Sequence, residues 1–126
     1  MAVGVVSIPV ADQDRALAFY TDVLGLHLLT DAAMAPGMRW LQLQPADGGA
    51  SVALVTWFES MPPGGLQGLL FHVADIDAEH ARMGAAGVRC SAVEEQPWGR
   101  FTMLNDPDGN GLIVAQLTAP EDIATR

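Results

Sequence analysis

The stretch Val10-Ala11-Asp12-Gln13-Asp14 occurs a second time as Val73-Ala74-Asp75-Ile76-Asp77, with four of five residues identical. Each copy follows an apolar run and opens a segment that ends at a glycine, Gly25 in the first half and Gly87 in the second. An Asp side chain caps the start of a helix, and a glycine in the left-handed conformation ends one. The repeat therefore predicts two copies of one supersecondary unit.

The residues around the first copy predict a βαβββ unit. Residues 3–10 are rich in β-branched side chains, which favours a strand, and the helix that follows has one apolar face. This face consists of Ala16, Phe19, Tyr20, Val23 and Leu24. Three further strands are expected over residues 26–30, 38–44 and 51–57, with a loop over residues 31–37.

The second half repeats this order. We expect a strand over residues 69–73, a helix over 76–86, and strands over 88–94, 99–104 and 112–117. The segment Asn105-Asp106-Pro107-Asp108-Gly109-Asn110 is typical of a hairpin turn. The prediction is one α+β domain, with a first module at about 3–57, a linker at about 58–67, a second module at about 68–117 and a polar tail over 118–126.

Composition narrows the classes of function. The chain has 126 residues, half of them hydrophobic, and no apolar run approaches the length of a membrane span. A single cysteine, Cys90, and the lack of a signal-like N-terminus lead us to expect a cytoplasmic protein. The net charge is −9 and lysine is absent, which argues against nucleic acid and anionic membranes as partners.

The helix residues of the first half resemble the first-module signature of the vicinal oxygen chelate superfamily. This group includes glyoxalase I, bleomycin-resistance proteins and extradiol dioxygenases. The resemblance rests on Asp12, Ala16, Phe19-Tyr20 and Leu24-Gly25, and on the turn Asp106-Pro107-Asp108-Gly109-Asn110, and it extends over about residues 3–117. It implies paired βαβββ modules with curled mixed sheets around a cavity. It also implies a homodimer in which modules of two chains complete each site.

In metal-using members of this superfamily, four side chains on the first and last strands of the modules bind a divalent ion. The matching positions here are Val5, Ala53, Gly68 and Ile113. None of these residues carries an imidazole, carboxylate or thiolate ligand. We therefore expect no metal and no other cofactor. Even without a metal, the resemblance still implies a cavity, which bleomycin-resistance proteins use to sequester a drug.

Aromatic and polar residues on the predicted strands are candidates for lining this cavity. They are Trp40, Gln42, Trp57, Trp98, Arg100 and Phe101. Aromatic rings bind planar ligands by stacking, but they also fill cores and dimer interfaces. Arg100, like Arg39, either pairs with an anionic ligand group or is a solvated arginine that neutralises Glu94, Glu95 or Asp108.

The remaining reactive residues form no recognised site. His27, His72 and His80 show no close metal-ligand spacing; His72 is either a polar contact in the cavity or a structural histidine, and His80 is expected to be structural. Cys90 is expected to be an inert thiol.

The leading prediction is a metal-free protein of the drug-resistance or ligand-sequestering type, which binds a small molecule such as an antibiotic or another aromatic ligand. One alternative is a lyase, isomerase or dioxygenase of the same superfamily. It would use metal-free acid–base chemistry, or a relocated divalent metal bound through His72 and a carboxylate. The other is a purely structural or regulatory dimer whose cavity is filled by its own side chains.

Overall fold

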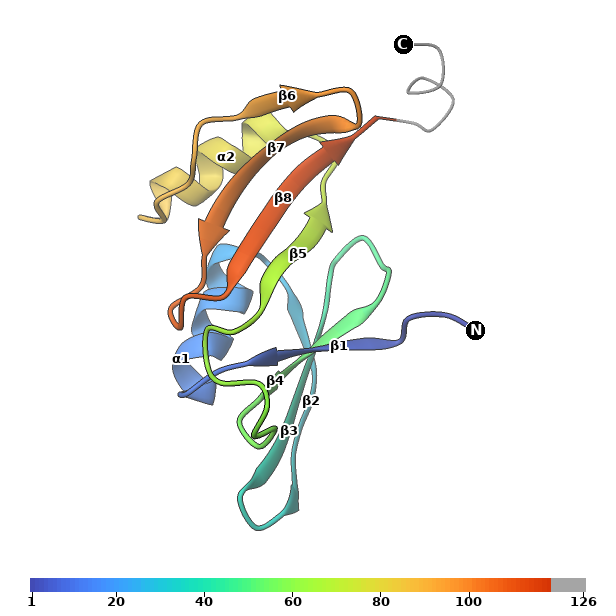
Figure 1. Cartoon of the computed structure of the whole chain (residues 1–126), viewed down its shortest axis with the longest axis vertical. Helices are drawn as coiled ribbons and strands as arrows, with labels where there is room; N and C mark the ends of the chain where they lie inside the picture. The colour runs from blue at the N-terminus through green and yellow to red at the C-terminus, as the bar shows by residue number, and fades with distance from the viewer. Residues whose placement is uncertain (119–126) are drawn as a thin grey trace. The chain divides into compact units, whose positions relative to one another are not determined.

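A computed structural model describes residues 1–118, which form two compact units. The first unit contains residues 1–66 and 106–110, and the second contains residues 67–105 and 111–118. Each unit has one four-stranded mixed sheet and one helical segment (Figure 1). The predicted pair of βαβββ modules is confirmed. Except for residue 118, the predicted polar tail lies outside the described residues.

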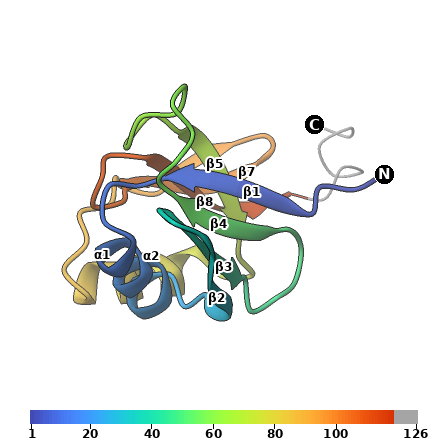
Figure 2. The same cartoon turned by 90° about the horizontal axis from the view of Figure 1, so that it is seen from below.

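The first unit contains a helical segment in two parts and four strands. These are β1 (Val5–Pro9), α1 (Gln13–Ala18), η1 (Phe19–Val23), β2 (His27–Ala35), β3 (Met38–Gln44) and β4 (Ser51–Val55). The strand order is β1-β4-β3-β2, with β1 parallel to β4 and the other pairs antiparallel. Figure 2 shows β1 and β4 side by side.

The helix of the first unit begins and ends at the predicted residues. The Asp12 side chain accepts a hydrogen bond from the backbone N–H of Arg15, and Gly25 has a φ of 73°. Between them, the α-helix changes to a π-helix at Phe19. Ala16 and Tyr20, four residues apart on one side of the segment, are fully buried, whereas the other predicted face residues are only partly buried.

The predicted loop over residues 31–37 is wrong. β2 continues to Ala35 and pairs with β3 along its length, with Asp31 opposite Leu41 and Ala33 opposite Arg39. The chain turns from β2 into β3 over Pro36 and Gly37, and Gly37 has a φ of 73°. The hydrogen bonds from β3 outweigh the weak strand preference of Asp and Ala in this segment.

The second unit contains one helix and four strands. These are β5 (Gln67–His72), α2 (Ile76–Ala85), β6 (Glu94–Gln96), β7 (Gly99–Asn105) and β8 (Gly111–Leu117). The strand order is β5-β8-β7-β6, with β5 parallel to β8. Asp75 caps α2 through the backbone N–H of Ala78, and Gly87 follows its end with a φ of 87°.

The strand predicted over residues 88–94 is largely wrong, because β6 begins only at Glu94. Ser91 lies beside β7, where its backbone N–H donates to the Met103 carbonyl. The Met103 N–H, however, donates to the Ser91 hydroxyl, at 2.8 Å. A side-chain oxygen therefore replaces the backbone carbonyl that a regular strand would offer.

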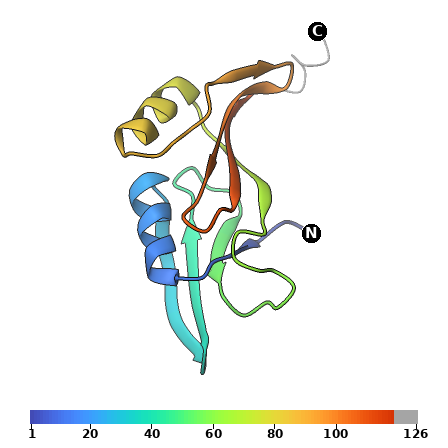
Figure 3. The same ribbon diagram turned by 60° about the vertical axis from the view of Figure 1, so that its left-hand side comes forward.

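Each helix covers one face of its own sheet. In the first unit, Ile8, Leu41 and Leu54 are fully buried with Ala16 of α1, and Figure 3 shows the helical segment along one side of that sheet. In the second unit, Ile76 and Met83 of α2 are buried together with strand residues Leu104, Leu112 and Val114. Alternate strand residues point to the opposite face, which no helix of the same unit covers within residues 1–118. Within residues 1–118, no helix is long and apolar enough to cross a membrane.

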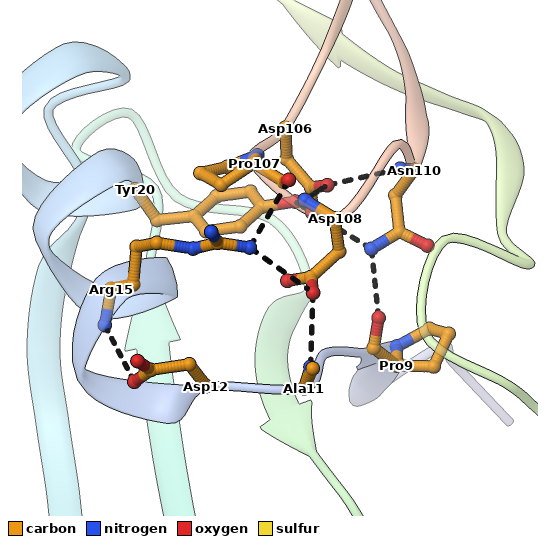
Figure 4. A network of polar contacts seen from close by, with 9 residues as sticks. All are labelled: Pro9, Ala11, Asp12, Arg15, Tyr20, Asp106, Pro107, Asp108 and Asn110. Atoms are coloured by element: carbon orange, nitrogen blue, oxygen red, sulfur yellow. Dashed lines mark hydrogen bonds and ion pairs between the residues drawn. The ribbon is translucent and has the colours of Figure 1, made fainter.

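A buried polar network holds the turn 106–110, which clusters with the first unit rather than with the strands that it joins (Figure 4). One oxygen of Asp106 accepts from the Tyr20 hydroxyl at 2.8 Å and from the Asn110 side chain at 2.7 Å. The other accepts from the backbone N–H groups of Asp108 and Asn110, both at 2.9 Å. The Asn110 side chain also donates to the Pro9 carbonyl at 2.8 Å. Burial, followed by the charge and hydrogen bond of Asp106, raises the pKa of Tyr20, so its hydroxyl stays protonated as a donor.

Candidate functional site

The face of the first sheet opposite α1, here called the first open face, carries three of the predicted ligand-binding residues. In β3, Leu41 and Leu43 are buried toward α1, so Trp40 and Gln42 point to the other side. The Trp40 and Trp57 rings lie 6.2 Å apart, and Phe58 lies 5.9 Å from Trp57. These residues form one partly exposed aromatic cluster.

Trp40 also orients Gln42. Its indole N–H donates to the Gln42 side-chain oxygen at 2.9 Å. An indole N–H is only a donor, so the amide must present its oxygen to Trp40. The Gln42 NH₂ group then remains on the first open face, with no protein acceptor among residues 1–118. This face therefore combines flat aromatic rings with a fixed hydrogen-bond donor.

The second sheet also has a face without a helix, here called the second open face. Thr102 and Leu104 are buried on the α2 side of β7, so Phe101 and Met103 point to the second open face. The Trp98 and Phe101 rings stack there at 5.1 Å with an interplanar angle of 22°. This pair is a second aromatic surface, built from two predicted site residues.

Arg100 lies on the other side of β7 from Phe101, because consecutive strand residues point to opposite faces. Its guanidinium contacts Asp77 of α2 at 2.8 Å and Glu95 at 3.3 Å. The hydrogen bond from Arg100 lowers the pKa of Asp77. Glu95, one of the carboxylates predicted to neutralise Arg100, therefore does contact it. Asp108, another of them, is paired with Arg15 instead.

Arg39 is held in the same way on the α1 side of the first sheet. It contacts Asp31 and Asp14, each at 2.8 Å, and its hydrogen bond lowers the pKa of Asp31. Arg39 and Arg100 therefore have carboxylate partners already, with which a ligand anion would compete.

A pocket of about 610 Å³ lies in the second unit. Met103 and Ile113 supply apolar side chains to it, and Arg89, Cys90 and Asn105 add polar groups. None of the six predicted ligand-binding residues lines this pocket. Of the positions named from the sequence, Gly68 and Ile113 line it, both as superfamily metal positions. Arg89 and Cys90 were not expected there, because residues 88–94 were predicted as a regular strand, whereas β6 begins only at Glu94. Two glycines in the paired strands β5 and β8, Gly68 and Gly111, are the signal that could have indicated it.

The four superfamily metal positions lie on the first and last strands of each module. Ala53 pairs with Ser7, and Val5 pairs with Ser51 in the same β1–β4 ladder. Gly68 and Ile113 both line the pocket of the second unit. Their side chains offer no donor atoms, and no three His, Cys, Asp or Glu side chains within residues 1–118 gather closely enough to hold a metal ion.

The three histidines lie on different elements of the structure. His72 is an exposed residue of β5, opposite Ala115, and His27 is exposed at the start of β2. The His80 ring nitrogen Nε2 lies 2.9 Å from the Ser91 carbonyl, which confirms its structural role. This contact helps to hold the irregular segment 88–93 that borders the pocket.

Burial raises the pKa of the Cys90 thiol. We expect iodoacetamide at pH 8 to alkylate Cys90 several-fold more slowly in the folded protein than in urea, because the thiolate is the nucleophile. Mass spectrometry over time measures this directly, since the chain has one cysteine. Equal rates in the two states would contradict the raised pKa.

Comparison with known proteins confirms the resemblance found in the sequence. The family model "Glyoxalase/Bleomycin resistance protein/Dioxygenase superfamily" matches residues 2–114. The structure is similar to TnmS3, an antibiotic binding protein from Streptomyces sp. CB03234, with a TM-score of 0.89 and 42% identity over 94% of this chain and 97% of that chain.

Two other proteins are similar to this chain over most of its length. A glyoxalase/bleomycin resistance protein from the same Streptomyces has a TM-score of 0.85 and 42% identity, over 91% of this chain and 100% of its own. The uncharacterized protein YetH of Bacillus subtilis (strain 168) is 30% identical over 118 residues, which are 90% of this chain and 97% of YetH.

Proposed function

Because the chain belongs to the Glyoxalase/Bleomycin resistance protein/Dioxygenase superfamily, we propose that it binds a planar aromatic small molecule without a metal, as a resistance or sequestering protein. The observation that carries this proposal is the first open face, where the Trp40–Trp57 cluster adjoins the free NH₂ group of Gln42. The 42% identity to an antibiotic binding protein over 94% of the chain supports it. The lack of donor atoms at Val5, Ala53, Gly68 and Ile113 supports binding without a metal.

The proposed binding mode uses each group for a different purpose. Trp40 and Trp57 stack on the flat body of the ligand, and such aromatic pairs contribute about 0.5–1.5 kcal/mol beyond the buried area. The Gln42 NH₂ group donates to a carbonyl or hydroxyl oxygen of the ligand, which orients it on the face. Trp98 and Phe101 offer the second aromatic surface.

We also propose that two copies of the chain associate. Apolar side chains remain uncovered on both open faces: Val5 is 40% exposed on the first, and Met103 is 49% exposed on the second. Burying such surface in a homodimer would stabilise it. A mass from light scattering that equals one chain at micromolar concentration would contradict this.

The binding proposal is tested with acridone, a neutral planar tricycle with one carbonyl. We expect acridone to quench tryptophan fluorescence saturably, and excess EDTA to leave the Kd unchanged. Replacing Gln42 with Leu should raise the Kd about fivefold to tenfold, because one hydrogen bond is lost.

The control is Gln96→Leu, the same change at an exposed residue of β6. We expect this variant to bind acridone like the wild-type protein. If neither acridone nor a panel of other planar aromatics quenches, the proposed function is wrong. Quenching that EDTA abolishes would favour the metal-dependent enzyme instead.

A further inference from the structure

We infer that the pocket of the second unit is a binding site of its own for an aromatic acid, whose carboxylate is bound by Arg89. It goes beyond the proposed function, because Trp40, Gln42 and Trp57 do not line this pocket. It depends on three properties of the pocket within residues 1–118: a cation that contacts no carboxylate, a lining without carboxylates, and an apolar surface.

Arg89 differs from the other arginines in residues 1–118. Each of the other four contacts a carboxylate: Arg15 contacts Asp108, Arg39 contacts Asp14 and Asp31, Arg82 contacts Glu79, and Arg100 contacts Asp77 and Glu95. Arg89 contacts no carboxylate of residues 1–118, although the chain has 15 acidic and only 6 basic residues. In a chain so rich in carboxylates, an arginine without one beside a pocket is available to an anion from outside.

The charge of the pocket lining favours a ligand carboxylate. Among the residues that the structure describes, Arg89 is the one charged residue of the lining, and no Asp or Glu side chain lines the pocket. Burial raises the pKa of the neighbouring Cys90 thiol, so that group is neutral at pH 7 and does not repel an anion. A bound carboxylate would therefore meet a positive field, even though the protein as a whole is strongly acidic.

The remaining lining specifies the rest of the ligand. Met103 and Ile113 form an apolar surface on which an aromatic ring can lie, and a thioether contacts ring edges favourably. The Ser91 hydroxyl is already engaged with Thr102 and with the Met103 N–H, so it competes little for the anion. The planar guanidinium of arginine matches a carboxylate with two parallel hydrogen bonds.

The test compares naphthalene-2-carboxylate with naphthalene-2-carboxamide, which differ mainly in charge, by isothermal titration of the full chain. We expect the carboxylate to bind about tenfold tighter than the amide, the effect of one hydrogen bond to a charged group. Arg89→Gln should abolish this preference and leave the Kd of the amide within about twofold, because the apolar contacts remain. Arg89→Lys, which keeps the charge but not the two-pronged geometry, should retain part of the preference.

Arg82→Gln is the matched control, because it removes the same charge from α2, outside the pocket lining. It should keep the preference for the carboxylate. Equal affinity of the two compounds for the wild-type protein, or a preference that survives in Arg89→Gln, would overturn the inference while acridone binding still supports the proposed function. If neither these compounds nor any planar aromatic binds, both are wrong.

Discussion

Replacing Asp106 with Asn is expected to lower the free energy of unfolding by about 3–4 kcal/mol, although the two side chains have nearly the same shape. Each carboxylate oxygen of Asp106 accepts two hydrogen bonds, and all four partners are donors. An amide must place its NH₂ group toward one of these donor pairs. Because Asp106 is only 5% exposed, water cannot replace the lost bonds.

Urea unfolding followed by circular dichroism measures this loss. Asp47→Asn is the control, since Asp47 lies in an exposed turn and the change in charge is the same. It should change stability by less than about 0.5 kcal/mol. Tyr20→Phe, which removes one of the four donors, should cost about 1–2 kcal/mol. A loss below about 1 kcal/mol for Asp106→Asn would mean that the network contributes little to stability.

The features that sequence reasoning predicted correctly depend on short stretches of chain. The caps by Asp12 and Asp75 involve N–H groups only three residues away, and the repeated pentapeptide marks both. The turn 105–110 was also recognisable from local chemistry. Its anchoring role was not, because the contact of Asp106 with Tyr20 joins residues 86 positions apart.

In the candidate site, too, features set by short stretches of chain were predictable and contacts between distant segments were not. The period of two along a strand places Trp40 and Gln42 on one face, and that grouping followed from the sequence. The same period separates Arg100 from Phe101, although both were proposed for one cavity. The position of Arg89 could not be predicted, because segment 88–93 is irregular and is held by bonds between Ser91 and Met103. Only the folded chain shows which arginine of residues 1–118 contacts no carboxylate of that range.

Replacing Gly64 with Ala is expected to cost about 3 kcal/mol or more. Gly64 has a φ of 82°, a conformation that L side chains rarely adopt, and a Cβ atom there would collide with the backbone carbonyl oxygen of Asp108. A backbone carbonyl in the anchored turn cannot rotate away as a flexible side chain can. The substitution therefore combines conformational strain with a steric clash.

Gly48→Ala separates these two causes. Gly48 has a φ of 91°, but a Cβ atom there meets nothing within 4 Å, so this variant should lose only about 1 kcal/mol from strain. The difference between the two variants, measured by urea unfolding, is the cost of the clash with Asp108. Equal losses would show that the turn shifts to accept the methyl group. If Gly64 and Asp106 stabilise the same turn, the double variant Gly64→Ala/Asp106→Asn should lose less than the sum of the single variants, because the second change acts on a turn already displaced.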